Sequence, residues 1–310
     1  MGVVPQQRCV LGCVHAPRQA EPPPVWSRFR HRRILSGFET AARMTDVILA
    51  VVEHPEAVPR TLAAAATLAA LVGDARVNVI AIRSPPEAEI VPGEEVLTRP
   101  HAERLIERER ARVAALRVEF DRFPGAEAFE WIDVEGLIEP VIEDWGGRAD
   151  IIVMPLPASE DTVADRAALH AALFRSDRPV LLVPPRWHGS FGRRVAIAWR
   201  DDRRTIKALI PALRWLDKAE RIEVLAGFRA GAVAPSPPAI LAEHGIAASF
   251  HALPIGEGVF GAALLKAAHE QGADLLIAGA FVHNPLRTLV LGGVTRYLLA
   301  HADLPVLVRH

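Results

Sequence analysis

The chain carries one pattern of strand-like and helix-like segments twice. From residue 46 to residue 310, short runs rich in Val, Ile and Leu alternate with longer stretches of helical character. Two landmarks recur in the same order, Ala-Asp before an apolar run at 149–153 and 273–277, and Pro-Val-Leu at 179–183 and 305–308. They recur after 124 and 126 residues, so the chain contains two copies of one α/β unit.

Each copy is expected to hold five parallel strands and about four helices, because apolar strands that alternate with helices build βαβ units. The predicted fold class is therefore α/β, with two tandem doubly wound parallel-sheet domains of Rossmann-like type. The first copy is the longer one, because it includes a loop at 84–100 and a long charged helix at 103–123. The expected strands are 46–52, 77–82, 128–133, 150–154 and 179–183 in the first copy, and 194–199, 221–226, 249–253, 274–278 and 305–308 in the second.

The predicted domain boundaries follow from composition and from breaks in the pattern. Residues 1–44 hold seven arginines, two glutamates and no periodic apolar segment, which is typical of a disordered extension. The favoured interpretation is an over-long gene start, and a transit peptide stays an alternative because the segment is rich in arginine. The first copy spans 45–185, a linker rich in Pro and Gly spans 186–193, and the second copy spans 194–310.

Charge and hydropathy exclude several classes of partner. A formal net charge of -1 and a pI near 6.9 give no long-range attraction to nucleic acid or to anionic lipid. The longest apolar stretch, 62–72, is far shorter than the roughly 20 residues that cross a bilayer. Cys9 and Cys13 lie in the extension and, with His15, lack a fourth metal ligand, so no metal is expected. A cysteine-free body fits a reducing cytoplasm.

The second copy contains a candidate phosphate-binding segment. A buried strand ends at Gly279, and after a short loop the pair Gly292-Gly293 opens a helix. Glycines at these places let bare backbone N–H groups approach an anion. The candidate nucleotide-binding residues are Trp199, Arg200, Gly279, Ala280, Val282, His283, Arg287, Gly292, Gly293, Val294 and Thr295.

This segment resembles the phosphate-binding region of universal stress proteins, which reads Gly-x2-Gly-x9-Gly-[Ser/Thr]. Gly279 and Gly292 take the first and third positions, whereas Val282 stands at the second and Gly293 at the fourth. The segment is also similar to the variant of two-domain members, Gly-Ala-Tyr-Gly-His-Ser-x-Leu-Arg followed by Gly-Gly-Val-Thr-Arg. The resemblance covers residues 46–310.

The resemblance implies strand order 3-2-1-4-5 and a nucleotide between the ends of strands 1 and 4. Trp199 matches the Trp-Asn-Gly-Ser of two-domain members, and Arg200 replaces the usual Asp or Asn. An arginine there favours phosphate or an acidic ligand over adenine. Asp201 and Asp202 have an alternative role, because either one can cap the following helix.

The implied function is that of a cytoplasmic stress-response protein, not an enzyme, whose second copy binds ATP or AMP as a regulatory ligand. Two alternatives stay open. One is an interaction protein of the same fold that binds no nucleotide. The other is a slow nucleotide hydrolase that uses His283, the imidazole beside the phosphate segment. A homodimer or another protein partner also stays open.

The first copy lacks the phosphate-binding residues. Pro155 and Pro157 follow its fourth strand, and no glycine occurs between Arg148 and His188. Proline has no N–H to donate, so this copy is predicted to be a structural partner without a nucleotide. The carboxylates of Glu160, Asp161 and Asp165, with no His, Cys or Ser arrangement expected beside them, are interpreted as a solvated acidic loop.

A second glycine pattern suggests a dinucleotide site. Gly256, Gly258 and Gly261 fit Gly-x-Gly-x-x-Gly between a strand and a helix. A dinucleotide site also needs an acid at the end of the next strand, and Asp274 precedes that strand instead. The favoured interpretation is a flexible loop at a helix entry.

Overall fold

The computed structural model describes residues 45–89, 98–156, 163–229, 231–233, 235–256, 259–280, 282–283 and 290–310. At residues 89, 163–164, 282–283 and 290–291 it describes the backbone alone. The predicted extension 1–44 lies outside the described residues.

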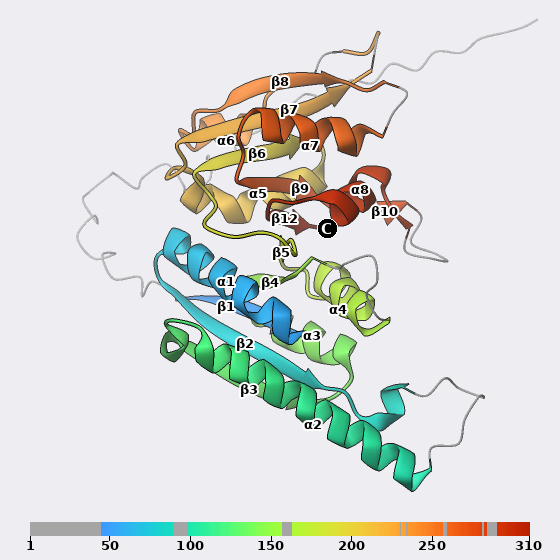
Figure 1. Ribbon diagram of the computed structural model, residues 1–310. Helices are drawn as coiled ribbons and strands as arrows, with labels where there is room; N and C mark the ends of the chain where they lie inside the picture. Colours follow the sequence, from blue (N-terminus) through green and yellow to red (C-terminus); the bar gives the residue numbers. More distant parts are fainter. Residues whose placement is uncertain are drawn as a thin grey trace, which may run out of the picture. The chain divides into compact units, whose positions relative to one another are not determined.

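Ten strands form one sheet, in the order β3-β2-β1-β4-β5-β12-β9-β6-β7-β8 (Figure 1). Both halves of this sheet show the order 3-2-1-4-5 that the family resemblance implies, and the α/β class is confirmed. Every expected strand is present, with its ends within two residues of the prediction. The strands are β1 Asp46–Val52, β2 Ala75–Arg83, β3 Phe129–Glu135, β4 Ile151–Pro155, β5 Val180–Val183, β6 Arg194–Trp199, β7 Arg221–Phe228, β8 Ser249–Pro254, β9 Leu275–Gly279 and β12 Val306–Arg309.

The two copies are joined strand to strand. β5 and β12 pair antiparallel, with Val306 opposite Leu182 and Val308 opposite Val180, whereas the neighbouring strands within each copy pair in parallel. The sequence predicted two tandem parallel-sheet domains, and this pairing closes one open edge of each copy and joins them in a single sheet. Because strand direction reverses between the copies, their carboxyl ends lie at opposite edges of the sheet.

Helices cover both faces of the sheet, and each face holds its own apolar core. Side chains along β1 alternate between the two cores, Ile48 and Ala50 in one, Leu49 and Val51 in the other. One face carries α1 Val58–Val72, α2 Arg99–Arg122, α5 Arg203–Leu216 and α6 Ala239–Glu243, and the other carries α3 Ile138–Gly147, α4 Val163–Phe174, α7 Phe260–Glu270 and α8 Gly293–His301.

Shorter elements complete the chain. They are the 3-10 helices η2 Pro55–Ala57, η3 Pro86–Glu89 and η4 Ala126–Ala128, and the paired strands β10 Val282–His283 and β11 Val290–Leu291. Within the parts of the chain that the structure describes, no helix combines the length and the apolar character that a membrane crossing requires.

The aspartate of each repeated Ala-Asp landmark caps the start of the first strand in its own copy. Asp150 Oδ2 accepts a hydrogen bond from the Val47 N–H at 2.9 Å. The Asp274 carboxylate accepts from the N–H groups of Gly192 at 2.8 Å, Arg193 at 3.1 Å and Arg194 at 3.1 Å. The sequence repeat therefore marks a repeated structural bond between strands 4 and 1.

Candidate functional site

The candidate site lies at the carboxyl edge of the second copy. The strand order reverses between β6 and β9, which are neighbours whose next strands lie on opposite sides. Ligands of open α/β sheets bind at such a switch point. The N-termini of α5 and α8 follow the carboxyl ends of β6 and β9, so backbone N–H groups are available at this edge.

Gly292 and Gly293 open helix α8, as the sequence predicted. Gly292 is the N-cap residue and has no side-chain cap, and its carbonyl accepts a hydrogen bond from the Arg296 N–H at 2.9 Å. Gly293 is exposed, and a Cβ built on it meets nothing within 4 Å. The first turn, which includes Val294, therefore leaves backbone donors and the positive end of the helix dipole without a side-chain partner from the cap residue.

Gly279 has a packing role at the end of β9. A Cβ on this residue would lie 3.0 Å from the Thr205 backbone nitrogen and 3.1 Å from the Arg204 carbonyl carbon, both in the first turn of α5. Its neighbour Ala280 is buried and donates its N–H to the Arg309 carbonyl at 2.8 Å. The glycine that sequence reasoning assigned to ligand approach lets α5 lie close to β9.

Trp199 is held in the core at the end of β6. The residue is 7% exposed, and its indole N–H donates to the Ser236 carbonyl at 2.9 Å. The indole therefore binds a backbone carbonyl of its own chain and faces the core.

Arg200, the next residue, is exposed and lies 3.4 Å from Asp202. Asp202 Oδ1 accepts from the N–H groups of Arg204 at 3.1 Å and Thr205 at 3.0 Å, so the helix-cap interpretation of Asp202 is confirmed.

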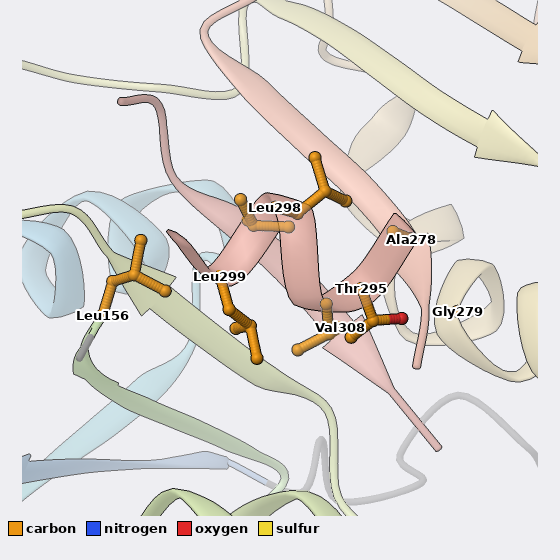
Figure 2. A pocket seen from close by; sticks show the side chains of 8 residues that line it. Leu156, Ala278, Gly279, Thr295, Leu298, Leu299 and Val308 are labelled. Atoms are coloured by element: carbon orange, nitrogen blue, oxygen red, sulfur yellow. The ribbon is translucent and has the colours of Figure 1, made fainter. Parts of the chain in front are cut away.

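A small apolar pocket lies beneath the site (Figure 2). Its volume is about 10 Å³, which is room for about one water molecule and far less than the several hundred Å³ of a small-molecule site. Thr295 lines it and is 3% exposed. A nucleotide would therefore lie outside this pocket. The lining residues are Leu156, Ala278, Gly279, Thr295, Leu298, Leu299, Val306 and Val308.

The remaining predicted residues lie between Ala280 and Gly292. Arg287 falls outside the described residues. Val282 and His283 form β10, in which Val282 is opposite Leu291 and His283 opposite Val290, and their side chains are outside the described set. The sequence predicted a loop here and not this antiparallel pairing, because strands of two residues each are too short to show an alternating pattern.

Residues 239–310 match the sequence model of the Universal stress protein family. This segment belongs to the universal stress protein family. It runs from α6 to β12 and includes the ends of β9 and the start of α8. The universal stress protein segment thus contains the candidate phosphate-binding residues from Gly279 to Thr295.

Solved structures extend the likeness in fold to both copies. The chain is similar to a universal stress protein from Archaeoglobus fulgidus DSM 4304, with 14% identity, a TM-score of 0.60 and coverage of 86% of this chain and 98% of that one. A putative universal stress protein from Pseudomonas aeruginosa UCBPP-PA14 gives 14% identity, a TM-score of 0.50 and coverage of 86% and 93%. No curated protein matches the sequence. Identity at this level shows the shared fold.

The first copy holds a histidine–aspartate pair where the second copy has its candidate site. His54 Nε2 lies 2.7 Å from Asp165 Oδ1, which joins the end of β1 to the start of α4. The prediction that no histidine lies beside Asp165 is wrong, because sheet order brings together residues that are 111 positions apart. Glu160 and Asp161 lie outside the described residues. Across the described segments, no group of three or more metal-ligating side chains occurs.

Arg112 of α2 fills the adjoining part of the same edge. Its guanidinium donates to the Glu53 carbonyl at 2.9 Å and also to the Ile82 carbonyl, at the ends of β1 and β2. Pro155 and Leu156 stand where the second copy has Gly279 and Ala280. These contacts favour a structural role for the first copy.

Glu109 is expected to make stability depend on acid pH. Burial alone would raise its pKa, but the hydrogen bond and charge of Arg112, 2.9 Å away, and the Ser84 N–H outweigh burial, so the pKa lies below 4.5. A lowered folded-state pKa stabilises the fold above pH about 4.5, and this contribution is lost as the pH falls through the folded-state value.

Glu109→Gln is therefore expected to lower the melting temperature at pH 7 by about 1–3 °C and to make its decrease between pH 5 and pH 3 shallower. Thermal unfolding followed by circular dichroism at several pH values measures both effects. The control is Glu103→Gln, which removes an exposed ion pair with Arg99 on the same helix. An unchanged acid slope in Glu109→Gln would contradict the assignment.

The alternative dinucleotide pattern lies away from the switch point. It follows the edge strand β8, and Gly258 lies outside the described residues. A Cβ on Gly261 would lie 2.7 Å from the Tyr297 Cβ, so this glycine lets α7 pack against α8. A Cβ on Gly256 meets nothing within 4 Å. Helix packing therefore explains Gly261, the more tightly enclosed of the two pattern glycines that the structure describes.

Proposed function

We propose that the second copy binds the phosphate end of an adenine nucleotide, ATP or AMP, as a regulatory ligand in a stress-response protein of the cytoplasm. The start of α8 at the switch point carries this proposal. Gly292 and Gly293 offer backbone N–H groups there without a side-chain cap, in a segment of the universal stress protein family. Arg200 adds a positive charge at the neighbouring end of β6.

Phosphate is expected to dominate recognition of the nucleotide. Trp199 is buried and bonded to Ser236, and the pocket at Thr295 has room for about one water molecule, so neither offers a platform for adenine. Binding is then expected to discriminate weakly between bases. As a regulatory ligand, the nucleotide would shift the population of the state that binds a partner.

Equilibrium dialysis of the full chain against labelled ATP and labelled AMP, with analysis of the products, tests this proposal. The expected result is one nucleotide per chain, because the histidine–aspartate pair and Arg112 occupy the edge of the first copy. No binding at millimolar nucleotide would leave the interaction protein as the remaining function. Formation of ADP that stops in His283→Ala would favour the slow hydrolase.

Gly293→Asp is expected to weaken ATP binding at least about tenfold without lowering the melting temperature. The position is exposed and open, and an acid in the first turn stabilises a helix by about 0.3–1 kcal/mol while it repels phosphate. Gly293→Ala is the matched control and should keep binding. If Gly293→Asp binds ATP like the original protein, the phosphate does not lie at this helix end.

A further inference from the structure

Basic side chains gather at the carboxyl end of β12, on the side of α5. Arg309 ends β12, and Arg204 and Lys207 lie in the first two turns of α5. A carboxylate of the first copy, Asp177 in the loop between α4 and β5, faces this group. The antiparallel pairing of β5 with β12 places the start of one beside the end of the other, and this brings Asp177 to the carboxyl edge of the second copy.

The contacts between the Asp177 carboxylate and these basic side chains are long. Arg309 Nη2 donates to the Asp177 carbonyl at 3.0 Å but lies 3.6 Å from its carboxylate, and Lys207 Nζ lies 3.9 Å from the same carboxylate oxygen. The Asp177 side chain is 74% exposed. Ion pairs of this length at the surface are weak and screened by salt, so a stronger anion can replace the carboxylate.

Three cationic side chains and one carboxylate make up this cluster. Arg204, Lys207 and Arg309 are cations at neutral pH, and Asp177 supplies one negative charge among these four side chains. The pKa of the neighbouring His310 is lowered from 6.5 by burial and then by the charges of Arg204 and Lys207, which outweigh Asp177. The His310 ring itself packs edge-on against Phe174 of α4, with 5.1 Å between the ring centroids, and Phe174 belongs to the core on the other face of the sheet.

Asp177 is turned toward the other copy, unlike its counterpart in the repeat. It has a left-handed backbone, with φ 51°, which Asp and Asn adopt more readily than other residues with a side chain. The equivalent residue of the second copy is Asp303, which likewise stands two positions before the proline of the landmark. Asp303 lies 2.6 Å from His269 of its own copy. The repeat therefore offers a natural control for the role of Asp177.

We propose that Arg204, Lys207 and Arg309 form a binding site for a phosphate group, with Asp177 as the counter-ion that the phosphate displaces. Arg309 is the neighbour of Gly279 in the sheet, so the site shares the carboxyl edge with the start of α8 but lies on the α5 side. This phosphate site is separate from the proposed nucleotide site, because phosphate binding here requires no nucleobase and no contact with α8. It gives the first copy a part in ligand binding through one residue.

Isothermal titration of the full chain with sodium pyrophosphate tests the site. Asp177→Asn keeps a residue that accepts the left-handed backbone and removes the competing charge, so it is expected to tighten binding about threefold to tenfold. Lys207→Gln, an exposed change, should weaken it by a similar factor. Asp303→Asn removes an equivalent charge outside the cluster and should change the affinity less than twofold. Binding should also weaken as salt rises from 50 to 300 mM.

Equal effects of Asp177→Asn and Asp303→Asn, or no effect of Lys207→Gln, would overturn the phosphate site. Titrations with inorganic phosphate, ATP and adenosine identify the source of the phosphate. If ATP binds and responds to Gly293→Asp but pyrophosphate does not bind, this site fails and the nucleotide site stands. If pyrophosphate binds and responds to Asp177→Asn whereas ATP gains nothing over pyrophosphate, this site stands and the nucleotide site fails.

Discussion

Asp274→Ala is expected to lower the free energy of unfolding by about 2–3 kcal/mol. Its carboxylate accepts hydrogen bonds from the backbone N–H groups of Gly192, Arg193 and Arg194, where the linker enters β6. Removing it leaves these donors without their acceptor, and the Gly192 nitrogen lies in a buried residue. Urea unfolding at pH 7, followed by circular dichroism, measures the loss.

Asp150→Ala is the matched variant in the first copy, where the carboxylate receives the single N–H of Val47. Its cost should be smaller, about 1 kcal/mol. The pH dependence of the free energy of unfolding is a second measurement. Burial raises the pKa of Asp274, against the three backbone hydrogen bonds, so the pH-dependent part of its contribution to stability is largest at low pH and decreases as the pH rises through the folded-state value. Asp274→Ala should lack this decrease. Equal losses in the two variants would contradict the assigned contacts.

Gly279→Ala is expected to destabilise the protein by about 1–3 kcal/mol, even with no ligand present. The new methyl group would lie 3.0 Å from the Thr205 nitrogen, and backbone at the start of a helix cannot move aside as a flexible side chain does. Thermal and urea unfolding of the ligand-free protein measure the effect.

Gly293→Ala serves as the control within the same motif, because its methyl group enters open space. It should be neutral or stabilise the protein by up to about 1 kcal/mol, since alanine has the higher helix propensity. If Gly279→Ala is as stable as Gly293→Ala and yet loses nucleotide affinity, Gly279 serves ligand approach and the packing role is wrong.

The architecture followed from local patterns. Apolar β-branched runs predicted the inner strands of the sheet, because a strand buried on both faces must be apolar throughout, whereas the edge strands β3 and β8 are only partly buried. The repeated landmarks predicted two copies, and their aspartates proved to bond strand 4 to strand 1 in each. The glycine pair predicted the start of α8, which has Gly292 as its N-cap and Gly293 as its first residue. The strands, the repeat and the helix start are set by residues close together in sequence, whereas the partners of the two aspartates lie far from them along the chain.

The candidate site was less accessible to sequence reasoning. Gly279 and Trp199 match a family motif, yet Gly279 lies against Thr205 and Trp199 donates a hydrogen bond to Ser236. No local sequence pattern predicts these partners. The pair of His54 and Asp165 was missed for the same reason. The sequence shows a histidine after the first strand of the copy and an aspartate after the fourth. Only the strand order 3-2-1-4-5 makes these two strands neighbours and so brings the two side chains together.

The sequence by itself determined two α/β copies, their strand order by resemblance, and one glycine-opened helix end in the second. Only the tertiary structure showed that β5 and β12 pair antiparallel. This pairing joins the two copies in one sheet and places Asp177 beside the basic side chains of the second copy. The physical reason is that strand and helix formation depends on neighbours along the chain. Edge pairing and charge clustering depend instead on surfaces that exist only after each copy has folded.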